Sequence, residues 1–310
     1  MPCGGGELWT IAWHVHRGVT WVFSTRTSPT DVTLMKGASM RVFNLLFGND
    51  VKSLTLRPGL VGTATPTPDD AEKAGWCGGD APAIGPRSWP RSQYTGLPMI
   101  HVITLKLPVE YRCQGDDLVA ISLFSAEDGE ADVRDEVEAV FEGDDVEGES
   151  PLVDEVRDFI AHRHPQQRDL EDILDGNLAL LWLTESEFSG PKTSPPVDHG
   201  HERDDVSRNA WDHTAEECGV WLSERHDDPN AGIPPEDFPN DDPPYTDVLD
   251  LGDDFMARIE TGSHIGGTIV DTEGLPNGMS QYFLRLEHDI GGMYFKSYLD
   301  LKTGLFAAQD

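Results

Sequence analysis

The sequence has few cysteines, few basic residues and no long apolar run. Each of these features excludes some classes of protein. Its four cysteines among 310 residues are scattered, with no C-x-x-C pair, which is typical of reduced thiols rather than of a disulfide framework. No apolar stretch approaches the about 20 residues that a membrane helix needs. The first residues contain no basic leader. We therefore expect a cytoplasmic protein that has no membrane partner.

The sequence signatures of common enzymes are also missing. The chain contains no G-x-S-x-G, no P-loop and no G-x-G-x-x-G. Paired acids such as Asp144-Asp145 and Asp241-Asp242 are too abundant here to indicate a hydrolase, which needs two specific acids in one cleft. We therefore expect a binding protein rather than an enzyme, and we assign no catalytic residue and no cofactor other than a candidate zinc ion.

The net charge of -33 is concentrated in the middle of the chain. Residues 1–126 carry 10 acids and 11 bases, residues 127–260 carry 40 acids and 9 bases, and residues 261–310 carry 6 acids and 3 bases. We divide the chain accordingly into an N-terminal, mostly β half, an acidic helical or loop segment, and a C-terminal β half, together forming one compact unit. Nucleic acid is excluded as a partner, because binding it requires clustered bases.

Several segments have clear secondary-structure signals. Residues 8–24 predict two strands broken at Arg17-Gly18, and residues 99–108 and 117–126 predict two further strands. Ile290-Gly291-Gly292 predicts a hairpin near the C-terminus. Ser150 followed by Pro151 predicts the start of a helix that continues to about His164.

Other segments favour helices less directly. Residues 38–47 and 169–174 predict short helices, and residues 205–224 place apolar side chains at helical spacing. The apolar run from Asn177 fits a strand or a helix, and the segment after Glu127 fits a strand, a helix or a loop. Residues 227–246 are rich in proline and aspartate and exclude regular structure.

Two segments of the sequence contain the same features in the same order. Gly78-Gly79 and Gly266-Gly267 each precede a proline-bearing loop and then a strand, from Met99 and from Tyr282. This repeat predicts an α+β fold of mainly antiparallel sheets, with an internally duplicated loop-strand unit and a few helices in the acidic middle.

These segments resemble the YwqG-like family of bacterial proteins over about residues 80–126 and 261–310. The resemblance is carried by a Trp-Pro loop with a Gly-x-Pro turn, a His-x-Gly-Gly element and a closing strand pair. The residues of this structural motif are Trp89, Pro90, Gly96, Pro98, His264, Gly266 and Gly267. Ile103-Thr104 and Arg285-Leu286 stand where the family often has glutamine, so no role of those glutamines carries over. The resemblance implies an α+β fold with pseudo-symmetry, and some family members are suspected to be immunity proteins.

Histidine pairs are the main candidates for a metal site. The richest cluster lies in residues 198–205, where His199 and His201 form a His-x-His pair with His213 downstream. These are ligand types that zinc prefers, although the spacing fits no established zinc motif. Surface histidines in a polar loop are the alternative.

The concentrated acidity favours an immunity or antitoxin-like protein that occludes the cationic cleft of a basic partner, such as a toxin or nuclease. Trp211 is a candidate aromatic anchor within the acidic face, with core packing as the alternative. The expected acidic contacts are Asp144, Asp145, Glu147, Glu149, Asp204, Asp205, Asp241 and Asp242. A metal-dependent enzyme that uses the histidine cluster, and a salt-adapted protein, remain alternative hypotheses. The oligomeric state stays open.

Overall fold

A computed structural model describes most of the chain and divides it into two compact units, residues 1–38 and 39–310. The described residues are 14–16, 19–21, 40–56, 70–127, 134–144, 146, 150–171, 177–201, 208–226, 228–238, 262–269 and 275–308. In the first unit, β1 (His14–His16) and β2 (Val19–Trp21) pair antiparallel, which confirms the two strands predicted there.

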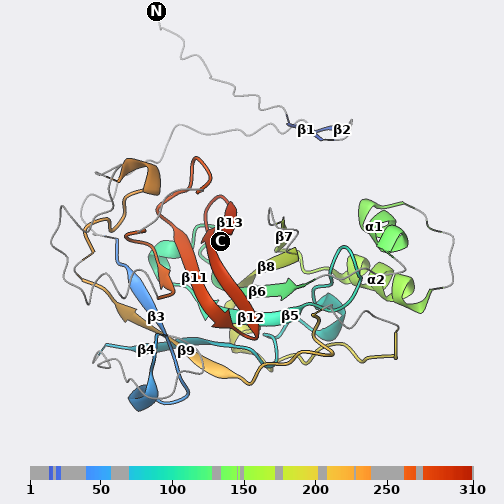
Figure 1. Cartoon of the computed structure of the whole chain (residues 1–310), viewed down its shortest axis with the longest axis horizontal. Coiled ribbons are helices and arrows are strands. Elements are labelled where there is room, and N and C mark those ends of the chain that lie inside the picture. Colours follow the sequence, from blue (N-terminus) through green and yellow to red (C-terminus); the bar gives the residue numbers. More distant parts are fainter. Residues whose placement is uncertain are drawn as a thin grey trace, which may run out of the picture. The chain divides into compact units, whose positions relative to one another are not determined.

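The second unit is built on one eleven-stranded antiparallel sheet, and Figure 1 shows its arrangement. Its strands are β3 (Phe43–Phe47), β4 (Glu72–Cys77), β5 (Ile100–Lys106), β6 (Leu118–Ala126), β7 (Gln167–Glu171), β8 (Asn177–Thr184), β9 (Cys218–Glu224), β10 (His264–Ile265), β11 (Phe283–Ile290), β12 (Met293–Asp300) and β13 (Phe306–Ala308). Their order in the sheet is β13-β12-β11-β10-β3-β9-β4-β5-β6-β8-β7. A sheet-rich, mainly antiparallel fold is therefore confirmed.

Helices are few among the described residues. The α-helices are α1 (Arg134–Glu142), α2 (Pro151–His162) and α3 (Glu185–Ser189). Short 3₁₀ turns occur at η1 (Val51–Ser53), η2 (Pro86–Ser88), η3 (Val109–Tyr111) and η4 (Pro235–Asp237). In the described part of the chain, no helix is both long and apolar enough to cross a membrane.

The sheet curls so that its two ends approach each other. Arg168 of the edge strand β7 donates a hydrogen bond of 2.9 Å to the carbonyl of Thr303, in the turn between β12 and β13 at the other end. The β11–β12 turn lies against β5, because a Cβ on Gly291 would come within 2.4 Å of the Val102 carbonyl oxygen. One apolar core consequently runs through the curled sheet, from Leu170 of β7 to Leu299 of β12.

A second core covers the outer face of β6 and β8. Trp89, from the loop after β4, is 1% exposed, and its ring meets Phe124 of β6 edge to face at 5.4 Å. Its indole N–H donates to the Met99 carbonyl at 2.8 Å. The Trp-Pro loop therefore serves as packing for the central strands.

The Gly-Gly turn after β10 is fixed by a buried polar network. The Asp228 carboxylate accepts hydrogen bonds from the backbone and hydroxyl of Thr268 and from the backbone of Asn230, and it pairs with Arg225 at 2.8 Å. Gly267 has φ of 82°, and a Cβ there would come within 2.5 Å of the same carboxylate. The Asp228 network therefore requires glycine at this position.

His264 is buried beside this network. Burial lowers the pKa of the His264 imidazole well below its usual value, and the charges of Arg225 and Arg285 lower it further. The ring donates a hydrogen bond from Nδ1 to the Gly266 carbonyl at 2.8 Å. Because burial and two nearby positive charges both disfavour the imidazolium, we interpret His264 as a neutral member of the packed core.

Three predicted helices are wrong in the described residues. Residues 43–47 form β3 and residues 167–171 form β7. Residues 208–217 form an irregular connection and residues 218–224 form β9. β3 and β9 are held by pairing with partners that lie far away in the sequence, which local spacing does not report. β7 pairs instead with β8, the next strand along the chain.

Candidate functional site

The candidate site lies where helix α2 meets the loop that follows α3. Glu155 projects from the first half of α2, and the loop brings His199 and His201 to it. Gly200 has φ of 78° and open space around its Cβ position, and its N–H donates to the Asp198 carboxylate at 2.7 Å. This tight turn directs both histidines of the His-x-His pair toward the helix.

Both imidazoles converge on a single carboxylate oxygen. His199 Nδ1 and His201 Nε2 each lie 2.8 Å from Glu155 Oε1. Since an ionised carboxylate only accepts, each ring nitrogen donates in this arrangement. The second oxygen, Oε2, accepts from the Arg91 guanidinium at 2.8 Å, and Arg91 also donates to the Gly96 carbonyl. Glu155 is therefore held at both oxygens.

Aromatic packing supports the same cluster. The ring of His201 stacks on Trp211 at a centroid distance of 5.8 Å and an angle of 26°. The Arg91 guanidinium lies 5.9 Å from the same indole ring, whose N–H donates to the Pro196 carbonyl. The side chain of His201 is 9% exposed and that of His199 is 62% exposed, so the cluster is closed on one side and open to solvent on the other.

The electrostatics of the cluster keep Glu155 ionised. Burial by itself raises the pKa of the Glu155 carboxyl, but hydrogen bonds from His201 and His199 and the charge of Arg91 outweigh it, so the pKa lies below its usual value. Burial lowers the pKa of the Arg91 guanidinium, and Glu155 opposes that effect. A carboxylate with its charge preserved is a competent metal ligand.

Two imidazoles and a carboxylate are a donor set that suits zinc. The ligand atoms of Glu155, His199 and His201 all lie within 4.8 Å of one another. A zinc ion with Zn–N distances of about 2.0–2.1 Å places its tetrahedral ligands about 3.3 Å apart. The hydrogen bonds of 2.8 Å would therefore have to lengthen by about 0.5 Å for an ion to enter. Exposed His199 supplies that freedom.

The structure brings together two of the three predicted metal ligands. His199 and His201 lie in the cluster, whereas His213 is an exposed residue outside it, and Glu155 stands as the third candidate ligand. Trp211 is half-buried within the cluster, where it contacts His201 and Arg91. Trp211 therefore belongs to the buried side of the histidine cluster.

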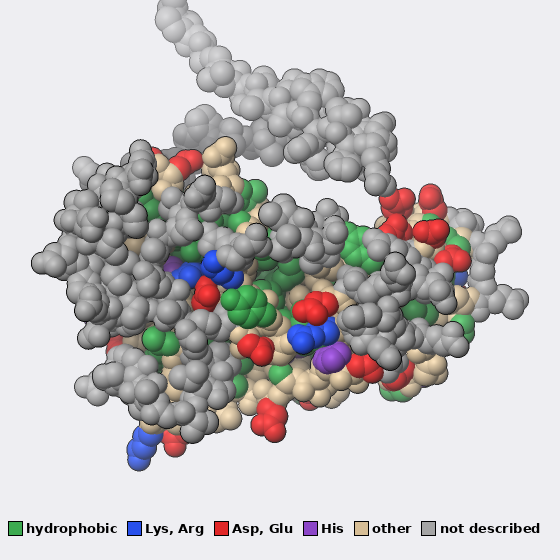
Figure 2. Space-filling model, in the orientation of Figure 1, with side chains coloured by type: hydrophobic (Ala, Val, Ile, Leu, Met, Phe, Trp, Pro, Cys, Tyr) green, Lys and Arg blue, Asp and Glu red, His purple; other side chains and the backbone are tan. Residues whose placement is uncertain are grey.

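Few of the predicted acidic contacts can be placed. Asp144 is exposed just after α1. The other predicted contacts lie outside the described residues: Asp145, Glu147, Glu149, Asp204, Asp205, Asp241 and Asp242. Figure 2 shows acidic side chains gathered over the end of the second unit that carries α1. The exposed acids of this α1 face are Asp135, Glu136, Glu142 and Asp144.

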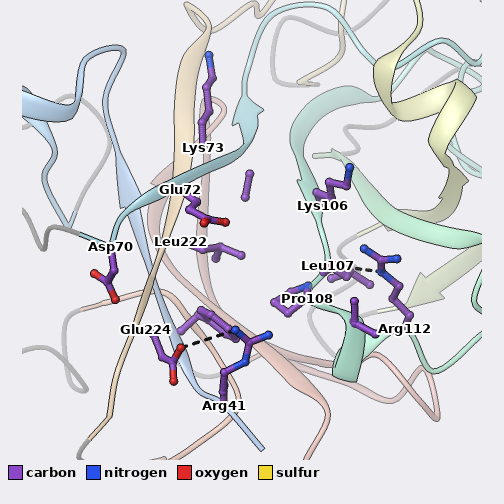
Figure 3. A pocket seen from close by; sticks show the side chains of 13 residues that line it. Arg41, Asp70, Glu72, Lys73, Lys106, Leu107, Pro108, Arg112, Leu222 and Glu224 are labelled. Carbon is purple, nitrogen blue, oxygen red and sulfur yellow. Dashed lines mark hydrogen bonds and ion pairs between the residues drawn. The ribbon is translucent and has the colours of Figure 1, made fainter.

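A separate cleft of about 360 Å³ lies at one end of strands β3, β4, β5 and β9. In Figure 3, Asp70, Glu72 and Glu224 line one side of it, and Lys106 and Arg112 line the other. Leu107, Pro108 and Leu222 lie between the two walls.

Several charges around this cleft are already paired within the protein. Arg41 binds Glu110 at 2.7 Å and lies 3.7 Å from Glu224, and Lys106 binds Glu185 at 2.9 Å. A ligand would have to compete with these ion pairs. The cleft has an apolar floor, but its charges are less available to a ligand. The Glu155 cluster is therefore the stronger candidate for a ligand site.

Comparison with protein families, with curated proteins and with solved structures finds no match to this chain. The resemblance to the YwqG-like family therefore stays a prediction. What can be said of function rests on the site itself.

Proposed function

We propose that this chain binds Zn²⁺ through Glu155, His199 and His201. The observation that carries the proposal is the convergence of both histidines of one His-x-His pair on a single, doubly anchored carboxylate. The acidity of residues 127–260 adds a negative potential that attracts cations to this region. Arg91, which holds the far oxygen of Glu155, acts as the outer partner that orients the ligand.

Three protein ligands leave a fourth position for water or substrate, as in zinc enzymes rather than in closed structural sites. When bound in such a site, zinc lowers the pKa of its water to about 7 and polarises carbonyl or phosphoryl oxygens. The exposed side of the cluster, at His199, is where a substrate would approach. The proposed activity is thus that of a metal-dependent enzyme, the alternative that the sequence left open.

Calorimetric titration with zinc tests this site. The chelator-treated chain should bind one Zn²⁺, and His199→Asn or Glu155→Gln should weaken binding at least tenfold, because outer partners alone change metal affinity by about 10- to 100-fold. His213→Asn is the matched control and should bind like the unchanged chain, since His213 is exposed outside the cluster. Equal affinities for the chain and for His199→Asn would refute the assignment.

We propose as a second candidate that the α1 face docks a basic protein, such as a toxin or nuclease, and occludes its cationic cleft. Exposed Asp135, Glu136, Glu142 and Asp144 support it, because an exposed group of like charges steers an oppositely charged partner. The resemblance to the YwqG-like family, with its suspected immunity proteins, points to the same role in the cytoplasm.

Capture of partners from host lysate tests the second candidate. A single basic protein should be retained at low salt and released at high salt, since exposed charges are screened. The triple variant Asp135→Asn, Glu136→Gln, Asp144→Asn should lose that protein. The control variant Asp116→Asn, Asp117→Asn, Glu236→Gln neutralises three exposed acids elsewhere and should retain it. Equal loss from both variants would argue against an α1 docking face.

We also propose that the fold is an internally duplicated α+β fold. Gly78-Gly79 follows β4 and Gly266-Gly267 follows β10, and all four glycines have positive φ. After each pair the chain returns as an antiparallel neighbour, β5 beside β4 and β11 beside β10. This common order supports a shared origin of the two loop-strand repeats.

A further inference from the structure

Two of the cysteines lie directly opposite each other in the sheet. Cys77 ends β4, Cys218 begins β9, and the antiparallel register pairs their Cα atoms. Opposed residues of antiparallel strands have Cα atoms about 4.5–5.5 Å apart. Disulfide-bonded cysteines have Cα atoms about 4.4–6.8 Å apart. The register therefore places the two thiols within bonding reach without a shift of either strand.

The two thiols have different environments. Cys77 is 2% exposed, whereas Cys218 is half-buried at the start of its strand. A hydrogen bond from Cys77 lowers the pKa of the Cys218 thiol below its ordinary value, and nearby Lys73 adds to this effect. The same hydrogen bond and burial raise the pKa of Cys77. Cys218 is thus the accessible nucleophile, and Cys77 is a protonated thiol beside it.

We propose that Cys77 and Cys218 form a redox site that reduces hydroperoxides and closes to a disulfide. The Cys218 thiolate attacks the outer oxygen of the hydroperoxide, the O–O bond breaks, and the alkoxide or hydroxide leaves with the electron pair and takes up a proton. Cys218 becomes a sulfenic acid. The sulfur of Cys77 then attacks the sulfur of Cys218, and the thiol proton of Cys77 leaves with the displaced hydroxide as water.

The remaining described cysteine provides an internal comparison. Burial raises the pKa of the Cys113 thiol to about 11, and the charge of Asp300 contributes to the rise. A thiol with a raised pKa reacts slowly, because the thiolate is the nucleophile. Oxidation should therefore select Cys218 over Cys113, although both are half-buried.

Peptide mapping of the full chain after hydrogen peroxide treatment tests the proposal, with chelator present to exclude metal-catalysed oxidation. We expect a cross-link between the peptides of Cys77 and Cys218 and the loss of two of the four thiols. Cys77→Ser should instead accumulate a sulfenic acid on Cys218 that dimedone traps. Cys113→Ser should behave like the unchanged chain. A pair that stays reduced, or a cross-link that joins other cysteines, would overturn the proposal.

Alkylation of the unchanged chain gives a second measurement that does not depend on any variant folding. The rate of iodoacetamide labelling at Cys218 should reach its half-maximum at a pH below the ordinary thiol pKa of about 8.5. Cys113 should reach half-maximum well above that pH. The same midpoint for both cysteines would contradict an activated Cys218. Neither residue is a proposed zinc ligand, so this result is independent of the zinc titration.

Discussion

Replacement of Asp228 by alanine is expected to lower the free energy of unfolding by about 3–5 kcal/mol. The side chains of Asp228 and Arg225 are both fully buried and form an ion pair at 2.8 Å. Removal of the carboxylate leaves a buried guanidinium without its counter-charge. It also removes the acceptor for the backbone N–H groups of Thr268 and Asn230. A buried charge that loses its partner costs more than the intact pair contributes.

Urea unfolding followed by circular dichroism measures this change. Asp237→Ala is the matched control, because Asp237 is an exposed aspartate in nearby η4 and its loss should change the free energy of unfolding by less than about 0.5 kcal/mol. Asp228→Asn retains the shape and part of the hydrogen bonding, so it should fall between the two. A similar stability for Asp228→Ala and Asp237→Ala would show that the Asp228 network does not hold the Gly-Gly turn in place.

Replacement of Trp89 by alanine is expected to cost about 3–5 kcal/mol of unfolding free energy. The indole is 1% exposed, packs edge to face on Phe124, and donates to the Met99 carbonyl. The alanine variant would leave a large cavity over the central strands and an unsatisfied buried carbonyl. The cavity and the unsatisfied carbonyl therefore both destabilise the alanine variant.

Trp89→Phe separates the two contributions. Phenylalanine fills much of the cavity but lacks the N–H donor, so about 1–3 kcal/mol should be lost through the unsatisfied carbonyl of Met99. Val109→Ala at a 71% exposed side chain is the control and should be nearly neutral. Circular dichroism is the suitable probe, since Trp89 itself contributes to fluorescence. If Trp89→Ala proves as stable as Val109→Ala, the second core does not depend on the Trp-Pro loop.

The elements that sequence predicted well have local signals. Residues 99–108 and 117–126 are rich in branched apolar residues and became β5 and β6. Ser150 and Pro151 marked the beginning of α2 correctly, although the Ser150 side chain makes no capping hydrogen bond. Gly291-Gly292 marked the β11–β12 hairpin. In these segments the backbone preference of each residue agrees with its place in the fold.

Two of the failures, at β3 and β9, have a common physical cause. Every residue of β3 is buried, so its sequence lacks the alternation that distinguishes a strand from a helix. In residues 205–224, helical spacing of apolar side chains coincides with a strand whose neighbours are β3 and β4. Long-range pairing decides these segments. A single sequence without its partners cannot report that pairing.

The candidate site was predictable in part. The His-x-His spacing of His199 and His201 is a local signal, and both lie in the cluster. Glu155 had no such signal, because it is one of many acids and its role depends on α2 packing near the loop. His213 is close in sequence but exposed outside the cluster. Proximity along the chain is a poor guide to ligands that a helix and a loop bring together.

The position of β3 in the sheet also determines how the chain can fold during synthesis. Leu45 of β3 pairs with Leu222 on one side, and Asn44 pairs with His264 on the other. Both partners leave the ribosome long after β3 does. Until then β3 has two open edges of unpaired backbone, which are templates for aggregation. Contacts this distant slow folding, so the edges of β3 stay unpaired until β9 and β10 have been synthesised.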